Sequence, residues 1–309
     1  MFTSMVLAIL VTVIGNLLVI TSIAHFKQLQ TSINQLLLSL AVCDLLLGVF
    51  IMPCSAVRSV QGCWYLGGFL CKLHTSTDIM LSTSSIFHLS FISIDRYFAV
   101  CRPLSYRLII SNNTVLIMIA TSWLVPAIFA YGMIFSEMNL KGREDFYETH
   151  DCLGSCNIFF NALWGALDTL IAFFFPCSVI VGLYTKIFLV AKQHVKKIED
   201  SQNKYNEGGR GVVSQGSEQK AAKTLGIVVG VFIFCWLPFF VNSIVDPYTN
   251  FSTPPILFEV FIWLGYFNST ANPIIYALFY PWFRKCLNLI VTLKIFNTNS
   301  SYINVFATT

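Results

Sequence analysis

Seven stretches of the chain are each long and apolar enough to cross a lipid bilayer, which takes about 20 such residues in a helix. They lie near residues 5–25, 34–57, 71–101, 113–135, 158–190, 220–245 and 256–279. Hydrophobic residues make up 56% of the chain and charged residues only 11%, whereas a soluble domain carries about 25% charged residues. The stretches lack the two-residue alternation of a membrane β-barrel. The sequence therefore predicts an all-α membrane protein, a bundle of seven transmembrane helices.

A shorter segment with a different pattern follows the seventh stretch. Residues 281–291, PWFRKCLNLIV, combine aromatic and leucine side chains with basic ones. This composition predicts an amphipathic eighth helix that lies on the membrane surface. Cys286 within it is either a free thiol or a palmitoylation site.

The orientation follows from the placement of Lys and Arg, which are concentrated in cytoplasmic connections. Basic residues dominate the first, third and fifth connections and the tail, whereas the opposite connections are mostly acidic. We therefore expect an extracellular N-terminus, a transmembrane domain over residues 1–292 and a cytoplasmic tail over 293–309. Residues 199–219 are polar and rich in Gly and Ser, which predicts a mobile cytoplasmic loop. The formal net charge of +4 requires no nucleic-acid partner.

Three carboxylates fall inside the predicted helices: Asp44, Asp78 and Asp168. An Asp at membrane depth costs about 2.5 to 3.5 kcal/mol and indicates a functional site by default, although such a group can also serve only to tie helices together. Asp78 lies 18 residues before Arg96, and Asp168 lies 18 residues before Lys186. At 1.5 Å per residue, each is about 27 Å from the inner interface. The two carboxylates are thus expected at one level, in a site suited to cations.

Aromatic side chains are expected around these carboxylates. Aromatic faces beside a carboxylate favour an organic ammonium ion through ion pairing and cation–π contact, but aromatic residues at helical spacing also serve as plain packing. The ligand-binding side chains expected beside Asp78 and Asp168 are Ser82, Trp236, Phe239, Phe240, Trp263 and Tyr266.

Several motifs, in order and on successive helices, resemble those of the rhodopsin-like (class A) G-protein-coupled receptors. They are GNLLV around Asn16, LAVCD ending at Asp44, DRY at 95–97, Trp123, FFFP ending at Pro176, CWLP at 235–238 and NPIIY at 272–276. Together they cover nearly the whole chain. The resemblance implies a receptor that transmits ligand binding to a heterotrimeric G protein, with arrestin and receptor kinases as further partners, in the plasma membrane.

Longer segments are similar to those of one subfamily, the trace amine-associated receptors. These segments are HFKQL (25–29), KAAKTLGIV (220–228), WLGYFNST (263–270) and NSTANPIIYALFYPWFRK (268–285). That subfamily detects small amines, mainly as olfactory receptors. The resemblance implies that Asp78 binds a protonated amine, and that Asp168 matches the second carboxylate of members that sense diamines. It also implies coupling to a stimulatory or olfactory G protein that raises cyclic AMP.

Two ligand classes fit this pair of carboxylates. A ligand charged at both ends, such as putrescine, cadaverine or agmatine, satisfies both groups, whereas a monoamine leaves one buried charge unpaired. The sequence favours the diamine. The alternative is a primary monoamine such as phenylethylamine, with Asp168 protonated or bound to water.

The same resemblance implies roles in signal transmission. Arg96 pairs with Asp95 and with Glu218, and Tyr97 completes the DRY motif. The residues implied to connect the pocket below Trp236 to the far end are Ile86, Pro176, Phe232, Tyr184, Asn272, Pro273 and Tyr276, of which Tyr184 and Tyr276 meet in the active state. A sodium ion, the one non-protein group implied, is held by Asp44, Ser85, Asn268, Ser269 and Asn272. Cys71 and Cys156 form the expected disulfide.

Two features depart from the subfamily pattern. No cysteine precedes Cys43, so Cys152 lacks its usual N-terminal partner, and Asn250 carries the only outward-facing glycosylation sequon found. Two interpretations are open: the start of the chain is truncated, or the receptor folds and traffics less well and is non-functional. Either one bears on surface expression more than on the pocket.

Other classes of protein fit the sequence less well. A retinal-binding receptor needs a lysine in the seventh helix, and residues 256–279 contain none. A peptide or lipid receptor does not need the paired carboxylates. A secondary transporter usually has internal repeats and broken helices, which the sequence does not show. No nucleophile–base set accompanies the acids, so the sequence does not predict an enzyme.

Overall fold

The computed structural model describes residues 2–62, 64–141, 156, 160–204, 215–249 and 251–306. These residues form helices and connecting segments, with no strand among them. The α-helices are α1 Phe2–His25, α2 Ser32–Leu46, α3 Met52–Gln61, α4 Gly67–Cys101, α5 Pro103–Ile109, α6 Asn112–Phe135, α8 Ala162–Thr169, α9 Phe175–Lys204, α10 Gln215–Val245, α11 Pro255–Phe279 and α12 Pro281–Val291. Short turns of other helix types are η1 Lys27–Leu29, η2 Leu47–Ile51, η3 Leu170–Phe174, η4 Asp246–Tyr248, η5 Lys294–Phe296 and η6 Ser300–Tyr302.

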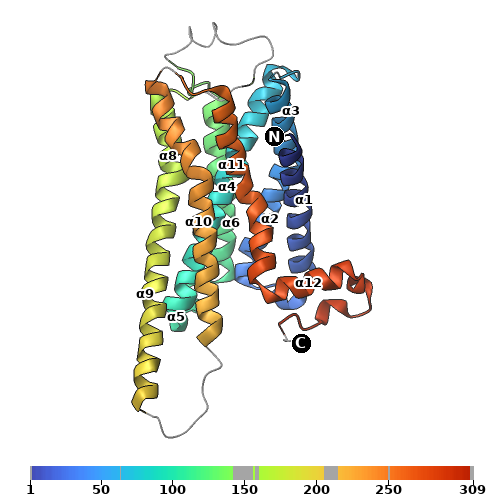
Figure 1. Ribbon diagram of the computed structural model, residues 1–309, viewed down its shortest axis with the longest axis vertical. Coiled ribbons are helices and arrows are strands. Elements are labelled where there is room, and N and C mark those ends of the chain that lie inside the picture. Colours follow the sequence, from blue (N-terminus) through green and yellow to red (C-terminus); the bar gives the residue numbers. More distant parts are fainter. Residues whose placement is uncertain are drawn as a thin grey trace.

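The long helices stand side by side as a bundle, and α12 lies across one end of it (Figure 1). Helices α2 and α3 form one span joined by η2, and α8 and α9 form another joined by η3. With α1, α4, α6, α10 and α11, these make the seven spans that the sequence predicts. Helix α12 covers the predicted amphipathic segment and meets α11 at 98°. The predicted fold class is confirmed.

Helix α4 differs from the other spans in composition. Five described spans are long and apolar enough by themselves to cross a membrane, and α11 qualifies only together with α12. The 35-residue α4 is not among them. It packs against α2, α6 and α9, so its many Ser, Thr, His and Asp side chains face protein instead of lipid. Polar residues in membrane helices are tolerated when they face the bundle interior.

Two spans contain a π-helical turn, and each turn directly precedes a proline. The turn η2 ends one residue before α3, which carries Pro53 in its first turn, and η3 ends just before α9, in which Pro176 is the second residue. Proline has no N–H to donate, and its ring clashes with the carbonyl four residues earlier in an α-helix. A wider turn at that point relieves the clash. Neither π-helical turn is predicted from the sequence.

The expected loop over residues 199–219 is shorter than predicted. Helix α9 continues to Lys204 and α10 already begins at Gln215, so the prediction is wrong for these two parts. Lys, Gln and Glu are good helix formers, and the first glycine after α9 is Gly208. The short helix α5, in the connection between α4 and α6, is also absent from the sequence-based expectations.

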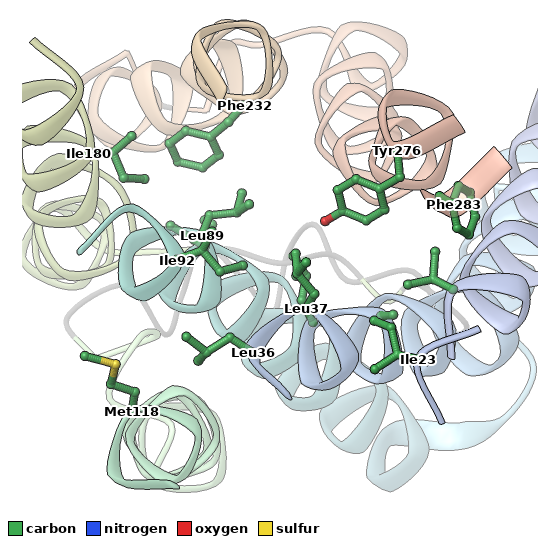
Figure 2. Close-up of a cluster of buried hydrophobic side chains, with 14 of the residues drawn as sticks. Ile23, Leu36, Leu37, Leu89, Ile92, Met118, Ile180, Phe232, Tyr276 and Phe283 are labelled. Carbon is green, nitrogen blue, oxygen red and sulfur yellow. The ribbon is translucent and has the colours of Figure 1, made fainter. Parts of the chain in front are cut away.

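The interior at the α12 end is an extensive apolar cluster to which most spans contribute (Figure 2). Without a hydrophobic driving force between helices in lipid, association depends on close packing, which small residues allow. Gly15 of α1 is one such residue, because a Cβ built there would lie 2.6 Å from the Cγ atom of Pro273 in α11. Gly265 similarly lies beneath the ring of Trp236, whose nearest atom would be 2.8 Å from an added Cβ.

We predict that Gly15→Ala lowers the thermal stability of the purified protein, because neither the α1 backbone nor the proline ring can yield. Overpacking of this kind costs about 1–3 kcal/mol. The matched control is Gly132→Ala in α6, where an added Cβ meets nothing within 4 Å, so that variant keeps or slightly raises the melting temperature. Equal melting temperatures for the two variants in detergent would contradict the close contact.

Candidate ligand-binding site

Asp78 lies in the N-terminal half of α4, at the end of the bundle that carries the Cys71–Cys156 disulfide. Its side chain is buried, and both oxygens accept hydrogen bonds. The Tyr266 hydroxyl donates to Oδ2 at 2.5 Å, and the Ser82 hydroxyl donates to Oδ1 at 3.3 Å. The carboxylate is therefore oriented by donors from α11 and from its own helix.

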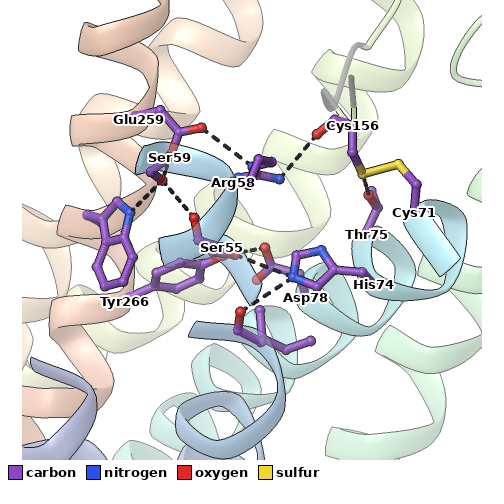
Figure 3. A network of polar contacts seen from close by, with 12 residues as sticks. Ser55, Arg58, Ser59, Cys71, His74, Thr75, Asp78, Cys156, Glu259 and Tyr266 are labelled. Carbon is purple, nitrogen blue, oxygen red and sulfur yellow. Dashed lines mark hydrogen bonds and ion pairs between the residues drawn. A yellow bond between two sulfur atoms is a disulfide. The ribbon is translucent and has the colours of Figure 1, made fainter. Parts of the chain in front are cut away.

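A chain of polar contacts extends from Asp78 toward the disulfide (Figure 3). Ser55 lies 3.1 Å from the Tyr266 hydroxyl and 3.4 Å from Nε2 of His74. Above it, Arg58 pairs with Glu259 at 3.5 Å and donates to the Cys156 carbonyl at 3.3 Å. This network joins α3, α4 and α11 to the segment that follows α6, and it fixes the upper wall of the site.

Asp168 lies on α8 and is only 3% exposed. Its Oδ1 atom has no hydrogen-bond partner among the described residues. The position follows directly from the local backbone, because η3 begins two residues later. An extra residue in one turn rotates the preceding helix by about 100° relative to an uninterrupted α-helix. The π-helical turn at η3 therefore sets the direction in which Asp168 projects.

One cavity of about 40 Å³ has both Asp78 and Asp168 in its lining. Of the side chains expected around them, Ser82, Trp236, Phe239, Phe240 and Tyr266 also line it. The aromatic rings contact one another, with ring centroids 5.7 Å apart for Trp236 and Phe240 and 6.1 Å apart for Trp236 and Phe239. Neither carboxylate has an ion-pair partner within the described residues. Buried carboxylates with aromatic neighbours are an arrangement whose chemistry suits an organic cation.

Trp263 is the one expected pocket residue that lies elsewhere. Its indole N–H donates to the Ser59 hydroxyl at 3.1 Å, and its side chain lines a separate groove between α1 and α11. Trp263 and Tyr266 are three residues apart on one helix, yet only Tyr266 faces Asp78. Trp263 therefore does not line the cavity with the carboxylates, although its ring packs edge to face on Tyr266 with centroids 5.4 Å apart, and its expected ligand-binding role stays a prediction.

Sequence reasoning also misses several residues that line the cavity. These are Ile79, Thr83, Phe160 and Ile262, and Ile86 reaches the cavity from the connector beneath it. Phe160 is 5% exposed, and the disulfide joins Cys156, four residues earlier in the sequence, to Cys71 of α4. The spacing of four residues from that cysteine is the only sequence signal for Phe160.

Comparison with known proteins identifies the family. Residues 15–276 match the 7 transmembrane receptor (rhodopsin family). Trace amine-associated receptor 13c of Danio rerio is 58% identical over 97% of this chain and 87% of its own length. Trace amine-associated receptor 1 of Macaca mulatta is 52% identical over 99% of this chain and 91% of its own length. The chain belongs to the trace amine-associated receptors. The receptor is thus a multi-pass membrane protein of a non-enzyme class, with a small ligand and a G protein as partners.

The residues expected to hold a sodium ion surround Asp44. Asp44 is fully buried and accepts hydrogen bonds from Ser269 at 2.7 Å and Asn272 at 2.8 Å. Ser85 lies beside the same carboxylate. Asn268 is buried on the same helix, and its Nδ2 atom has no partner among the described residues. The structure thus assembles an oxygen-rich cluster about Asp44.

The expected connector residues are buried below the pocket. Ile86 and Phe232 are both inaccessible to solvent. Phe173 stacks on Phe240 with centroids 4.9 Å apart and lies 5.9 Å from Phe232. Pro176 is buried one turn further along α9. An unbroken series of side-chain contacts therefore leads from the cavity wall to the apolar cluster at the α12 end.

Arg96 lies at that far end and is held by its neighbour in sequence. Its Nε atom donates to Asp95 Oδ2 at 2.8 Å, and its Nη2 atom donates to the same oxygen. The Tyr106 hydroxyl of α5 donates to Asp95 Oδ1 at 2.8 Å. The ring of Tyr97 packs against Phe98. Tyr184 and Tyr276 line one cavity with Arg96. The side chain of Glu218 lies outside the described residues, so its expected pairing with Arg96 stays a prediction.

The cysteine predictions have different outcomes. The disulfide between Cys71 and Cys156 is present and confirmed. Cys152 and Asn250 lie outside the described residues. Cys286 is fully buried against the apolar cluster at the α12 end, so its palmitoylation would require α12 to lift from the bundle.

We predict that Tyr106→Phe raises ligand-independent activation of the G protein. Burial and the hydrogen bond to Asp95 raise the pKa of Tyr106 to about 12, so the hydroxyl remains a donor throughout the physiological pH range. A hydrogen bond to a charged group contributes about 1.5–3 kcal/mol, and its loss weakens the hold of Asp95 on Arg96. Basal nucleotide exchange in membranes measures the effect, with Ser105→Ala as the neighbouring control. Unchanged exchange in Tyr106→Phe would contradict this role.

Proposed function

We propose that the receptor detects small amines that carry two cationic groups, with Asp78 binding one ammonium group and Asp168 the other. The observation that carries this proposal is the Oδ1 atom of Asp168. It is buried, lacks a hydrogen-bond partner among the described residues, and belongs to a side chain that lines the same cavity as Asp78.

The two carboxylates differ in what they need from a ligand. Asp78 already accepts bonds from Tyr266 and Ser82, so an ammonium group adds charge to a preorganised acceptor. Asp168 gains its first partner for Oδ1. A ligand with one ammonium group leaves that second buried acceptor unpaired, which costs about 1–3 kcal/mol or more for a charged group. Putrescine, cadaverine and agmatine have the two cationic ends that this arrangement favours.

The second candidate ligand class is a monoamine such as phenylethylamine. It is favoured by the aromatic cavity wall formed by Trp236, Phe239 and Phe240, against which an aryl ring packs. In that case Asp168 is neutral or binds water. Both classes are consistent with the names of the relatives, which are receptors associated with trace amines.

The small volume of the cavity couples binding to a change of conformation. A volume of about 40 Å³ holds only about three water molecules, so a diamine requires the walls to separate. Trp236 and Ile86 are parts of those walls and contact the interior below. A ligand that fits only the expanded pocket favours the expanded conformation by its differential affinity.

Signalling is proposed to run from this pocket to the Arg96 end of the bundle. We infer an extracellular N-terminus and a cytoplasmic C-terminus from the placement of basic residues. The receptor then activates a stimulatory or olfactory G protein, raises cyclic AMP and serves in olfaction. Arrestin and receptor kinases act as further partners at the same face, where the Asp95–Arg96 pair opens and Tyr184 approaches Tyr276.

The cluster about Asp44 is proposed to bind a sodium ion. A carboxylate with neighbouring hydroxyl and amide oxygens suits a hard cation, and the residues present, Asp44, Ser85, Asn268, Ser269 and Asn272, supply that set. We expect sodium chloride, compared with choline chloride, to lower agonist affinity in the wild type. In Asp44→Asn this difference disappears. A sodium effect of equal size in the variant would exclude the site.

The diamine proposal is tested with Asp78→Ala and Asp168→Asn in a cyclic-AMP assay. Removing one partner of a buried charge pair costs about 2–5 kcal/mol, so Asp168→Asn weakens diamine potency at least ~30-fold. The same variant leaves monoamine potency within about threefold, because a monoamine makes no ion pair at position 168. Asp78→Ala abolishes both responses.

Two controls accompany that assay. Asp246→Asn removes a partly buried carboxylate at the same end, one that lies outside the pocket and outside the Arg58–Glu259 network, and keeps the diamine preference. Surface labelling confirms equal expression of all variants. Diamine potency that is unchanged in Asp168→Asn would overturn the two-carboxylate proposal in favour of the monoamine.

A further inference from the structure

The chain beyond α12 folds back under the bundle. Leu293 and Asn299 adopt left-handed backbone conformations, with φ of 57° and 66°, and each begins a short turn, η5 and η6 respectively. These two turns reverse the chain, so that residues 293–306, here called the return segment, run beneath α12 toward the helices of the bundle (Figure 1). From the sequence, residues 293–309 are predicted only to form a cytoplasmic tail.

The return segment is attached to the connection between α1 and α2. Nε2 of His25 lies 2.9 Å from the Ser300 hydroxyl. Lys27 donates to the Tyr302 hydroxyl, and its ammonium group also lies 4.2 Å from the centroid of that ring. These contacts involve a histidine, a cation–π pair and η1, so the attachment is specific in geometry as well as in charge.

The last part of the return segment enters the interior. The backbone N–H of Val305 donates to the side-chain oxygen of Gln28 at 3.2 Å. The Val305 side chain is 2% exposed and belongs to the same buried apolar cluster as Phe26 and Cys286. A fully buried valine contributes about 1.5–3 kcal/mol through the apolar area it removes from water. The segment is therefore anchored, not merely adjacent.

Phe306, the next residue, lies at the cavity that Arg96 also lines. It lines a cavity of about 220 Å³ at the Arg96 end, together with Arg96, Tyr184, Phe232, Tyr276 and Tyr280. Leu89 and Ile92 of α4 also line it, and Figure 2 shows them beside Phe232, with Tyr276 on a different helix. The Phe306 side chain is 58% exposed, so it sits at the mouth of the cavity with part of its ring free.

We propose that the return segment is an intramolecular ligand of this cavity, with Val305 as its anchor and Phe306 as the group that blocks the mouth. A G protein must reach Arg96 to couple, and it then competes with a segment of the same chain. This inference rests on the proposed placement of the Arg96 end in the cytoplasm. It does not depend on the identity of the amine.

The consequence is a lower basal activity. Because the segment is tethered only a few residues from α12, its binding is intramolecular and benefits from a high effective concentration. A segment that binds only the uncoupled state shifts the equilibrium toward that state. Release of the segment therefore raises activity without any change in the amine pocket.

The main experiment compares two phenylalanines of the return segment. Phe306→Ala removes the ring that lines the cavity, whereas Phe296→Ala removes an 82% exposed ring that lines no described cavity. Basal nucleotide exchange is measured without ligand on the full-length receptor. G proteins of four α-subunit classes are first compared on the wild type, and the one with the highest exchange is used for the variants. We expect Phe306→Ala to raise basal exchange about two- to fivefold and Phe296→Ala to leave it unchanged.

A second measurement reports the position of the segment directly. Val305→Cys and Phe296→Cys are each alkylated in membranes, and modification at each position is read by peptide mass spectrometry. We expect position 305 to react at least about tenfold more slowly than position 296 in the free receptor. Its rate should rise when nucleotide-free G protein is bound, while that of position 296 stays constant.

The two measurements together decide the proposal. Equal basal exchange in wild type and Phe306→Ala, or equally fast alkylation at positions 305 and 296 in the free receptor, would overturn it. Because neither measurement uses an amine, failure of the diamine proposal would appear only in the cyclic-AMP assay and would leave these results unaffected.

Discussion

Lipid hydrocarbon offers no hydrogen-bond partner, so every polar side chain at membrane depth must be satisfied by the protein itself. The organisation of this receptor follows from that constraint. The polar helix α4 occupies the interior, and each of its carboxylates is held from elsewhere in the chain: Asp78 by Tyr266, and Asp95 by Tyr106 as well as Arg96. Asp44 on α2 is held in the same way by α11. Among the carboxylates of the described residues, only Asp168 has a buried oxygen, Oδ1, without a hydrogen-bond partner, and this supports the proposed ligand.

The cavity at Asp78 and Asp168 and the cavity at Arg96 lie at different levels of the bundle, and packed side chains connect them. Trp236 forms part of the pocket wall, and its ring lies against Gly265 with no room for even a methyl group. Below it, Phe240, Phe173 and Phe232 are in contact in series, and Phe232 also lines the cavity at the Arg96 end. This series of three aromatic side chains thus links the wall of the upper site to the cavity that a G protein would enter. Because the interior is close-packed, a displacement of side chains at one cavity requires side chains at the other to shift as well.

Much of this arrangement could be predicted from the sequence. Apolar length predicts most of the spans, although α4 is too polar to qualify by this measure. Counting residues along helices places Asp78 and Asp168 at one level, where they do share a cavity. Helical periodicity is too coarse to decide whether Trp263 lines the pocket with Tyr266, because residues three apart project only about 60° from one another around the helix axis. The π-helical turns depend on a local response to proline that composition does not reveal. The return segment depends on contacts between residues more than 270 positions apart in sequence, such as Lys27 and Tyr302, and no local pattern encodes those.

The π-helical turn η3 has a consequence for how ligand preference can change during evolution. Asp168 lies before the turn, whereas Pro176 and the rest of α9 lie after it. Loss of one residue within Leu170–Phe174 would restore an ordinary helical register and swing Asp168 about 100° around the helix axis. No residue that lines the pocket would be substituted, yet the carboxylate of Asp168 would face a different neighbour. Under the proposed function, selectivity between ligands therefore depends on the length of the backbone as well as on the identity of the acids, and an insertion or deletion can alter it as readily as a substitution.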